Sequence, residues 1–186
     1  FKRRKNKMSN KTNSKEFETI KSGYNKNPSL SKSLHKEAYI NPSWYNTDLE
    51  SIISRTWQWV CHTEKLREAG SYITIDIANQ PIMIIRDDKG LLKAFYNVCQ
   101  HRAHKLIDGE GLINRITCPY HAWTYNLDGK LIRAPHTEKL DQFELEDICL
   151  NEVQVEEFCG FIFVNLDKKA SSLKQQSKNL ESEIKY

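Results

Sequence analysis

The sequence predicts a small antiparallel all-β domain that follows a short helix. Two observations predict this fold class. Short runs rich in β-branched and aromatic side chains recur between residues 56 and 166, and such runs are typical of strands. Turn signals with glycine separate several of these runs, as in DDKG at 87–90 and in the pair Asp128 and Gly129. Neighbouring strands can fold back on each other at such turns.

Residues 1–34 are expected to form a disordered basic leader. Residues 1–16 carry seven Lys or Arg and one Glu, whereas the remainder carries 21 basic and 23 acidic residues. The segment is rich in Lys, Asn and Ser, and it has too few apolar residues to bury a core. A basic segment can bind nucleic acid or acidic lipid. A solvated leader is the simpler interpretation, so we predict no nucleic-acid partner.

The first ordered element is expected in a helical lead-in at residues 35–55. Thr47 and Glu50 have the spacing of a capping box, in which each side chain bonds a free N–H group at the helix start. Leu49, Ile52 and Ile53 follow at helical spacing. The sequence therefore predicts a short helix over about 48–55 that packs on the following strand.

Residues 56–166 are expected to form the β domain itself. The segments that carry cysteine and histidine, between residues 99 and 121, fall between predicted strands and are expected to be loops. Residues 167–186 are polar and are expected to begin a further helix. Strands are predicted at 56–62, 71–78, 81–87 and 91–98, in a hairpin at 124–135, and twice within 152–166 around Gly160.

Neither a membrane span nor a secretion signal is expected. No run of 18 or more apolar residues is present, and FKRRKNKMSN lacks the apolar centre of a signal peptide. We therefore predict a cytoplasmic protein that does not bind a membrane. Disulfides are rare in a reducing compartment, so metal ligation is the favoured use of cysteines that lie in motifs. The five cysteines form an odd set: Cys61, Cys99, Cys118, Cys149 and Cys159.

Four potential metal ligands lie in two short motifs. Cys99 and His101 form a Cys-x-His pair, and Cys118 and His121 form a Cys-x-x-His pair after 16 intervening residues. Structural zinc sites commonly use turns that each supply two cysteines, whereas each turn here supplies one cysteine and one histidine. That pattern suits a [2Fe–2S] cluster in which one iron binds both thiolates and the other binds both imidazoles. A zinc-stabilised binding module remains the alternative.

Both motifs resemble a known family. The segments NVCQHRAHKL and CPYHAWTYNLDGKL are similar to the two Rieske loops of Rieske non-haem iron oxygenase large (alpha) subunits. This group includes the ring-hydroxylating dioxygenases and the choline and betaine monooxygenases. The resemblance covers residues 36–170 and implies a Rieske-type domain with two cluster-binding loops. It also implies that Cys99 and Cys118 bind one iron of the [2Fe–2S] cluster and that His101 and His121 bind the other.

The resemblance further implies an oxidoreductase that hydroxylates or demethylates a small organic substrate with O2. Its electrons would come from an NAD(P)H-dependent reductase or a ferredoxin, and it would be a homo-oligomer, by resemblance a trimer. In the family, chemistry occurs at a mononuclear non-haem Fe(II) bound by two histidines and a carboxylate. This sequence has no histidine after His136. Residues 167–186 are therefore expected to be the start of a truncated α+β catalytic domain, and no catalytic residue is assigned. A standalone Rieske ferredoxin is the alternative.

The residues around the motifs indicate the class of Rieske centre. In respiratory Rieske proteins a disulfide joins the two loops, but the matching positions here are His104 and Tyr120. Those proteins also use a serine that bonds a cluster sulfur, and Trp123 occupies its place, although Tyr125 could still reach a ligand sulfur. Fewer hydrogen bonds to sulfur stabilise the added electron less. We therefore predict a reduction potential towards the low end of the Rieske range, roughly −150 mV.

Ala103 and Ala122 depart from the family pattern, which has glycine at both positions. Alanine disfavours the positive φ that glycine adopts readily. Either both residues have negative φ, or the loops are slightly rearranged.

Overall fold

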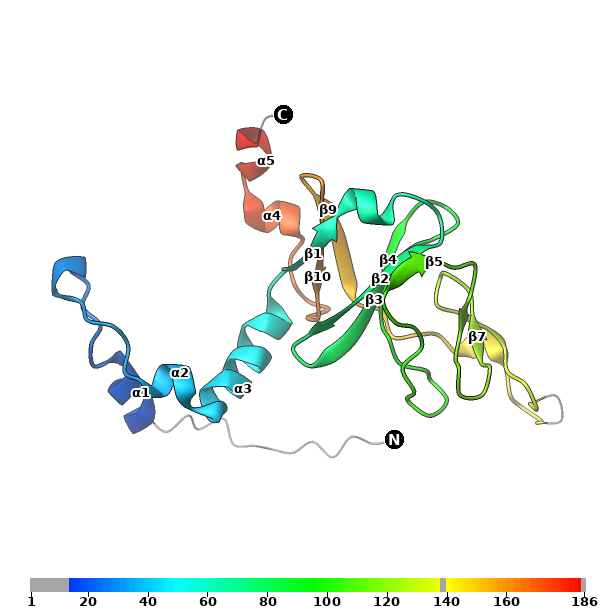
Figure 1. Ribbon diagram of the computed structural model, residues 1–186, viewed down its shortest axis with the longest axis horizontal. Coiled ribbons are helices and arrows are strands. Elements are labelled where there is room, and N and C mark those ends of the chain that lie inside the picture. Colours follow the sequence, from blue (N-terminus) through cyan, green and yellow to red (C-terminus); the bar gives the residue numbers. More distant parts are fainter. Residues whose placement is uncertain (1–13, 138–139, 185–186) are drawn as a thin grey trace. The chain divides into compact units, whose positions relative to one another are not determined.

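The computed structural model describes residues 14–137 and 140–184. The chain divides into two compact units, residues 1–48 and 49–186, and each is described by itself. The second unit contains three small antiparallel sheets (Figure 1). The predicted mostly β fold class is confirmed. No helix within the described ranges has the length and hydropathy needed to cross a bilayer.

The first unit contains helix α1 (Ser14–Lys21), the 3-10 turn η1 (Pro28–Leu30), helix α2 (Glu37–Ile40) and the start of helix α3 (Pro42–Ser51). The expectation of a disordered leader is wrong for α1. The Phe17 ring packs on Trp44 with centroids 6.3 Å apart, and Ile20 is buried. These contacts give the helix an apolar partner that the composition alone did not reveal. Residues 1–13, which carry most of the predicted leader's charge, lie outside the described residues.

Helix α3 begins earlier than predicted. Pro42 occupies its first position, where a missing N–H group is tolerated, and the Asn41 side chain accepts a hydrogen bond from the Ser43 N–H at 3.0 Å. Thr47 lies inside the helix and donates to the Ser43 carbonyl at 2.9 Å, so the predicted capping box is wrong. A 3-10 turn, η2 (Ile53–Arg55), follows the helix and ends the predicted segment.

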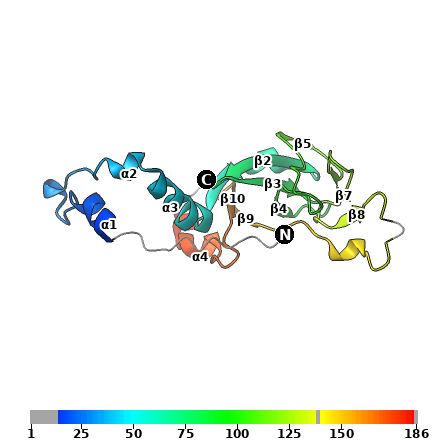
Figure 2. The same cartoon turned by 90° about the horizontal axis from the view of Figure 1, so that it is seen from below.

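The second unit places a four-stranded sheet between two three-stranded sheets, as Figures 1 and 2 both show. All strand pairs in the named sheets are antiparallel. The 3-10 turns η3 (Thr63–Leu66) and η4 (Leu145–Asp147) lie in the connections. In sheet order, the strands are β1 (Gln58–His62), β10 (Phe161–Asn165) and β9 (Gln154–Phe158); β4 (Leu92–Tyr96), β3 (Gln80–Arg86), β2 (Ser71–Ile77) and β5 (Glu110–Leu112); and β6 (Ile116–Thr117), β7 (Thr124–Tyr125) and β8 (Leu131–Arg133).

Strand β3 forms the centre of this unit because both of its faces are buried. Ile82 and Ile84 belong to one hydrophobic cluster, which also contains residues of β1 and β10. Met83 and Ile85 belong to the other cluster, which contains the cysteines of both motifs. Successive side chains of a strand point to opposite faces, so a continuous apolar run such as PIMII suits a strand between two layers. Each fully buried side chain of this size contributes about 1.5–3 kcal/mol.

The predicted turns are confirmed. The Asp87 carboxylate accepts hydrogen bonds from the N–H groups of Lys89 and Leu91, and Gly90 has a φ of +79°. Gly129, with a φ of +82°, lies in the β7–β8 turn against the Phe95 ring. The predicted C-terminal helix is present as α4 (Leu173–Ser177), which the Ser172 side chain caps, and α5 (Leu180–Glu183).

Candidate metal centre

Two loops with the same backbone arrangement carry the four predicted ligands. In the first loop the Cys99 N–H donates to the His104 carbonyl, and the Ala103 N–H donates to the Cys99 carbonyl. The second loop repeats both bonds 19 residues later. Each loop also closes an antiparallel pair with the same offset, between Val98 and Lys105 in the first. The equivalent second-loop residues are Cys118, Ala122 and Trp123 for the bonds and Thr117 and Thr124 for the pair.

The alanines that depart from the family pattern adopt the glycine-like conformation. Ala103 and Ala122 both have a φ of +55°, so the first of the two alternatives, negative φ at both residues, is wrong. The backbone keeps the same turn in both loops. An L-residue in this left-handed region is strained by roughly 1–2 kcal/mol.

The loops place the two cysteines inside the domain and the two histidines on its surface. Cys99 and Cys118 are 2% and 3% exposed, whereas His101 and His121 are exposed. The two imidazole rings lie edge to face, with centroids 4.8 Å apart. All five cysteines are free thiols. The structure thus brings the predicted ligands together as a buried thiol pair and an exposed imidazole pair.

This donor set fits a two-metal cluster better than a single ion. Within the described residues, no three His, Cys, Asp or Glu side chains converge closely enough to hold one metal ion. A mononuclear zinc site needs three or four ligands around one point, whereas a Rieske cluster needs only two protein ligands at each iron. Thiolate and imidazole donors in equal number also match that cluster's chemistry.

Tyr125 links the buried end of the site to the core. Its side chain is fully buried, and its hydroxyl oxygen lies 3.3 Å from Cys99 Sγ. The Gln100 N–H donates to the same oxygen at 3.0 Å, which leaves the hydroxyl proton free to donate to the sulfur. Tyr125 therefore reaches the sulfur of a predicted ligand, as the sequence suggested.

The same contacts shift the protonation of the site. Burial raises the pKa of the Cys99 thiol, and the hydrogen bond with Tyr125 acts in the opposite direction. Burial, followed by the bond with Cys99, raises the pKa of Tyr125, so the phenol keeps its proton and remains a donor. Desolvation, with the charges of His121 and Arg102, lowers the pKa of His101. Metals bind neutral imidazole, so this shift favours ligation.

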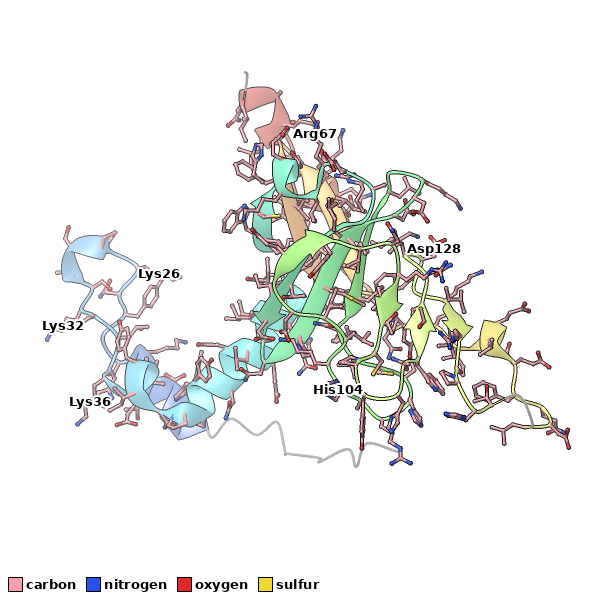
Figure 3. All side chains as sticks on the ribbon, turned by 45° about the vertical axis from the view of Figure 1, so that its right-hand side comes forward. Lys26, Lys32, Lys36, Arg67, His104 and Asp128 are labelled. Carbon is pink, nitrogen blue, oxygen red and sulfur yellow. The ribbon has the colours of Figure 1, made fainter. Side chains whose placement is uncertain are left out.

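Aromatic rings surround the two histidines. Trp123 is 8% exposed and stacks on His101, with centroids 4.7 Å apart and planes 9° from parallel. Phe143 packs edge-on against Trp123 at 5.9 Å. The ring centroid of Tyr120 lies 3.7 Å from that of His121 and 5.6 Å from that of His104. Figure 3 shows His104 near the tip of the loops, away from Asp128 and Arg67.

Sequence reasoning missed Asn97, which fixes the base of the first loop. This fully buried side chain accepts hydrogen bonds from the N–H groups of Leu106 and Ile107 and donates to the Ile107 carbonyl at 2.7 Å. The available signal was a polar residue directly after an apolar strand. Phe143 was also missed, because nothing near residue 143 indicates that it returns to the site.

Of the three cysteines outside the two motifs, only one packs as a small apolar side chain in a strand. Cys61 is buried in β1. Cys149 is exposed and therefore does not fill a core position. Cys159 is half-buried and has a φ of +50° in the turn between β9 and β10. The turn geometry, rather than a strand environment, determines its position.

Comparison with known proteins identifies the domain. Residues 56–144 match the family model described as Rieske [2Fe-2S] domain. The chain carries a Rieske domain. Over 151 residues it is 38% identical to the carnitine monooxygenase oxygenase subunit of Acinetobacter baumannii, covering 81% of this chain and 41% of the relative. It is 35% identical over 130 residues to the chloroplastic choline monooxygenase of Beta vulgaris, covering 70% of this chain and 29% of that protein.

Solved structures give the same assignment for the Rieske domain. The quaternary ammonium Rieske monooxygenase CntA in complex with L-carnitine aligns with a TM-score of 0.76 and 37% identity, over 80% of this chain and 42% of that one. Naphthalene 1,2-dioxygenase with bound indole aligns with a TM-score of 0.68 and 28% identity, over 73% of this chain and 31% of that one. The chain spans about two fifths of the length of the carnitine monooxygenase subunits.

Proposed function

We propose that this Rieske domain is the electron-transfer domain of an oxygenase and that Cys99, His101, Cys118 and His121 hold its [2Fe–2S] cluster. The two thiolates would bind one iron and the two imidazoles the other. The observation that carries this proposal is the pairing of a buried thiol pair with an exposed imidazole pair on two matching loops. When bound, such a cluster supplies reversible one-electron transfer, here at a potential of roughly −150 mV.

The residues of the chain divide the work of the site. Cys99 and Cys118 keep their donor atoms away from water. Tyr125 offers a single hydroxyl proton to sulfur, which supports a potential below that of Rieske centres with more such bonds. His101 and His121 are exposed, so electrons would leave the domain on this side.

We propose that the whole protein oxidises a small quaternary ammonium compound with O2. The printed names of the relatives, which concern carnitine, choline and glycine betaine, support this substrate class. The mononuclear iron and the catalytic residues would belong to an α+β domain that begins at residues 167–186. An NAD(P)H-dependent reductase or a ferredoxin would supply the electrons in the cytoplasm. The structure of one quaternary ammonium Rieske monooxygenase gives insights into inter-subunit electron transfer. This supports a homo-oligomer, and a trimer is our specific proposal.

Iron and acid-labile sulfide assays with low-temperature EPR test the electron-transfer function. The dithionite-reduced chain should contain two irons and two sulfides, and its rhombic signal should have an average g value below that of an all-cysteine cluster. Replacing Cys99 or Cys118 with Ser should abolish the signal, whereas replacing Cys149 with Ser should leave it unchanged. One zinc per chain and no sulfide would contradict the proposal and support a structural zinc module.

The oxygenase function requires a separate test. The reading frame after codon 186 should encode two closely spaced histidines and a downstream carboxylate. The protein from the complete frame, with a reductase and NADH, should consume O2 in the presence of L-carnitine, choline or glycine betaine. A frame that closes shortly after codon 186 would support a standalone Rieske ferredoxin instead.

A further inference from the structure

The two histidines of the site are covered by unequal partners. His101 stacks on Trp123, which is 8% exposed and is itself packed against Phe143. His121 contacts Tyr120, with centroids 3.7 Å apart and planes 34° from parallel, but Tyr120 is 55% exposed. The ring that covers His101, Trp123, is therefore part of the core, whereas the ring that covers His121, Tyr120, lies at the surface.

These contacts are related by the equivalence of the two loops. His101 is the third residue of the first loop, counted from its cysteine, and it contacts Trp123, the sixth residue of the second. Tyr120 is the third residue of the second loop, and it contacts His104, the sixth residue of the first, at 5.6 Å. Each loop thus places its third side chain on the sixth side chain of the other. One of these cross-loop contacts is buried and the other is exposed.

His104 is held in place from its own loop. Its Nδ1 lies 2.6 Å from the Lys105 carbonyl oxygen, and a carbonyl only accepts, so Nδ1 carries the proton and donates. The remaining ring edge and faces are free to contact Tyr120. His104, Tyr120 and His121 therefore form a row of rings in which the first supports the second and the second covers the third.

We propose that Tyr120 is a positioning residue for His121 and that His104 acts on His121 only through Tyr120. The inference rests on the proposed ligand role of His121. Contacts around a ligand histidine fix its ring orientation and control the access of water to the metal site. The Tyr120 ring, rather than its hydroxyl, makes the contact. Removing the Tyr120 ring would expose one face of the His121 imidazole to water and allow that imidazole to rotate.

The proposal predicts the direction of the change in reduction potential. A [2Fe–2S] core with two thiolates and two neutral imidazoles is neutral when oxidised and gains one negative charge on reduction. Water stabilises that charge better than an apolar ring does. Tyr120→Ala should therefore raise the potential. It should also release iron to a chelator about tenfold faster, the low end of the effect expected when a contact to a metal ligand is lost.

The test compares four variants and one control variant of the cluster-loaded chain. Tyr120→Phe should keep the parent's g values, potential and iron-release rate, because it keeps the ring. Tyr120→Ala should shift all three, and His104→Ala should shift them less and in the same direction. The double variant should equal Tyr120→Ala, since residues that act through one another are not additive. Tyr45→Ala is the matched control, because Tyr45 is 59% exposed and lies outside the Rieske domain.

Defined outcomes separate this inference from the proposed function. A parent chain that binds no iron and sulfide would contradict the ligand assignment itself. A loaded parent with an unchanged Tyr120→Ala variant would overturn the positioning role alone. Additive effects of His104→Ala and Tyr120→Ala would overturn the indirect role of His104. If Tyr120→Ala does not accumulate, the Tyr120→Phe and His104→Ala variants still decide, because an altered potential in Tyr120→Phe would assign the effect to the hydroxyl instead of the ring.

Discussion

Replacing Ala103 or Ala122 with Gly should stabilise the Rieske domain. Both alanines have a φ of +55°, and relief of this left-handed conformation is worth about 1–2 kcal/mol. Glycine makes the unfolded chain more flexible, which offsets about 0.4–1 kcal/mol of that gain. Both side chains are exposed, so little burial is lost. The net effect should be a gain of about 0.5–1 kcal/mol at each site.

Differential scanning calorimetry of the cluster-loaded chain measures this gain. For a domain of this size, 1 kcal/mol corresponds to a change of about 4 °C in Tm, so each variant should melt about 2–4 °C higher than the parent. All scans must use one heating rate, because loss of the cluster makes the unfolding irreversible and its apparent Tm rate-dependent.

Ala170 provides the control for this prediction. It is absent from the described residues with positive φ and is half-buried, so Ala170→Gly should lower the Tm, mainly through the unfolded state. If Ala103→Gly and Ala122→Gly lowered the Tm as much as Ala170→Gly does, the argument that these loops store backbone strain would be refuted.

Three further predictions follow from single contacts. Tyr125→Phe removes the hydroxyl 3.3 Å from Cys99 Sγ. Loss of this hydrogen bond, about 1 kcal/mol, corresponds to about 40 mV for one electron, so redox titration should show a potential lower by about that amount. An unchanged potential would show that the bond does not favour the reduced state. Gly129→Ala would place a Cβ 2.6 Å from the Phe95 ring, on a backbone with a φ of +82°. It should lower the unfolding free energy, measured in urea, by about 2–4 kcal/mol. A loss below about 1 kcal/mol would mean that the turn rearranges. Arg86→Met removes the hydrogen bonds that this side chain, 15% exposed, donates to the Leu66 and Gly90 carbonyls. It should lower the unfolding free energy by about 2–3 kcal/mol and therefore the urea midpoint. Lys65→Met, at the exposed pair with Glu110, should leave the midpoint unchanged.

The β domain could be predicted from sequence wherever a local signal decided the structure. The run PIMII and the turns at Gly90 and Gly129 combine side-chain preference with a backbone requirement that few other residues meet. Strands β5 and β6 were not predicted. They contain three and two residues, too few for a strand pattern. Strand β5 pairs with the distant β2, and β6 pairs with β7 across the second loop.

The helices show the opposite case, in which a plausible local signal was overruled. Thr47 and Glu50 have the spacing of a capping box, but Asn41 and Pro42 start the helix before it reaches Thr47. A helix that is already propagating needs no second start. For α1, the contact between Phe17 and Trp44 joins residues too far apart in sequence for a local pattern to reveal.

For the candidate site, the sequence supplied the donor atoms but not their surroundings. The spacing of cysteine and histidine indicates ligand chemistry, so the four residues could be named from the sequence. Their role as ligands stays a prediction. Asn97 and Phe143 could not be named, because their roles follow from where the chain returns in space. The positive φ of Ala103 and Ala122 could not be decided from the sequence, because the family's glycine indicates this conformation whereas alanine disfavours it.

The equivalence of the two loops bears on how such a site can be redesigned. Residues 99–104 and 118–123 share one six-residue backbone arrangement, with the same internal bonds and the same φ at the fifth position. The difference between Cys-x-His and Cys-x-x-His therefore requires no difference in backbone. The predicted ligand histidine is at the third position in one loop and at the fourth in the other, and the side chains at the second and sixth positions also differ. One backbone turn can therefore present an imidazole from either position.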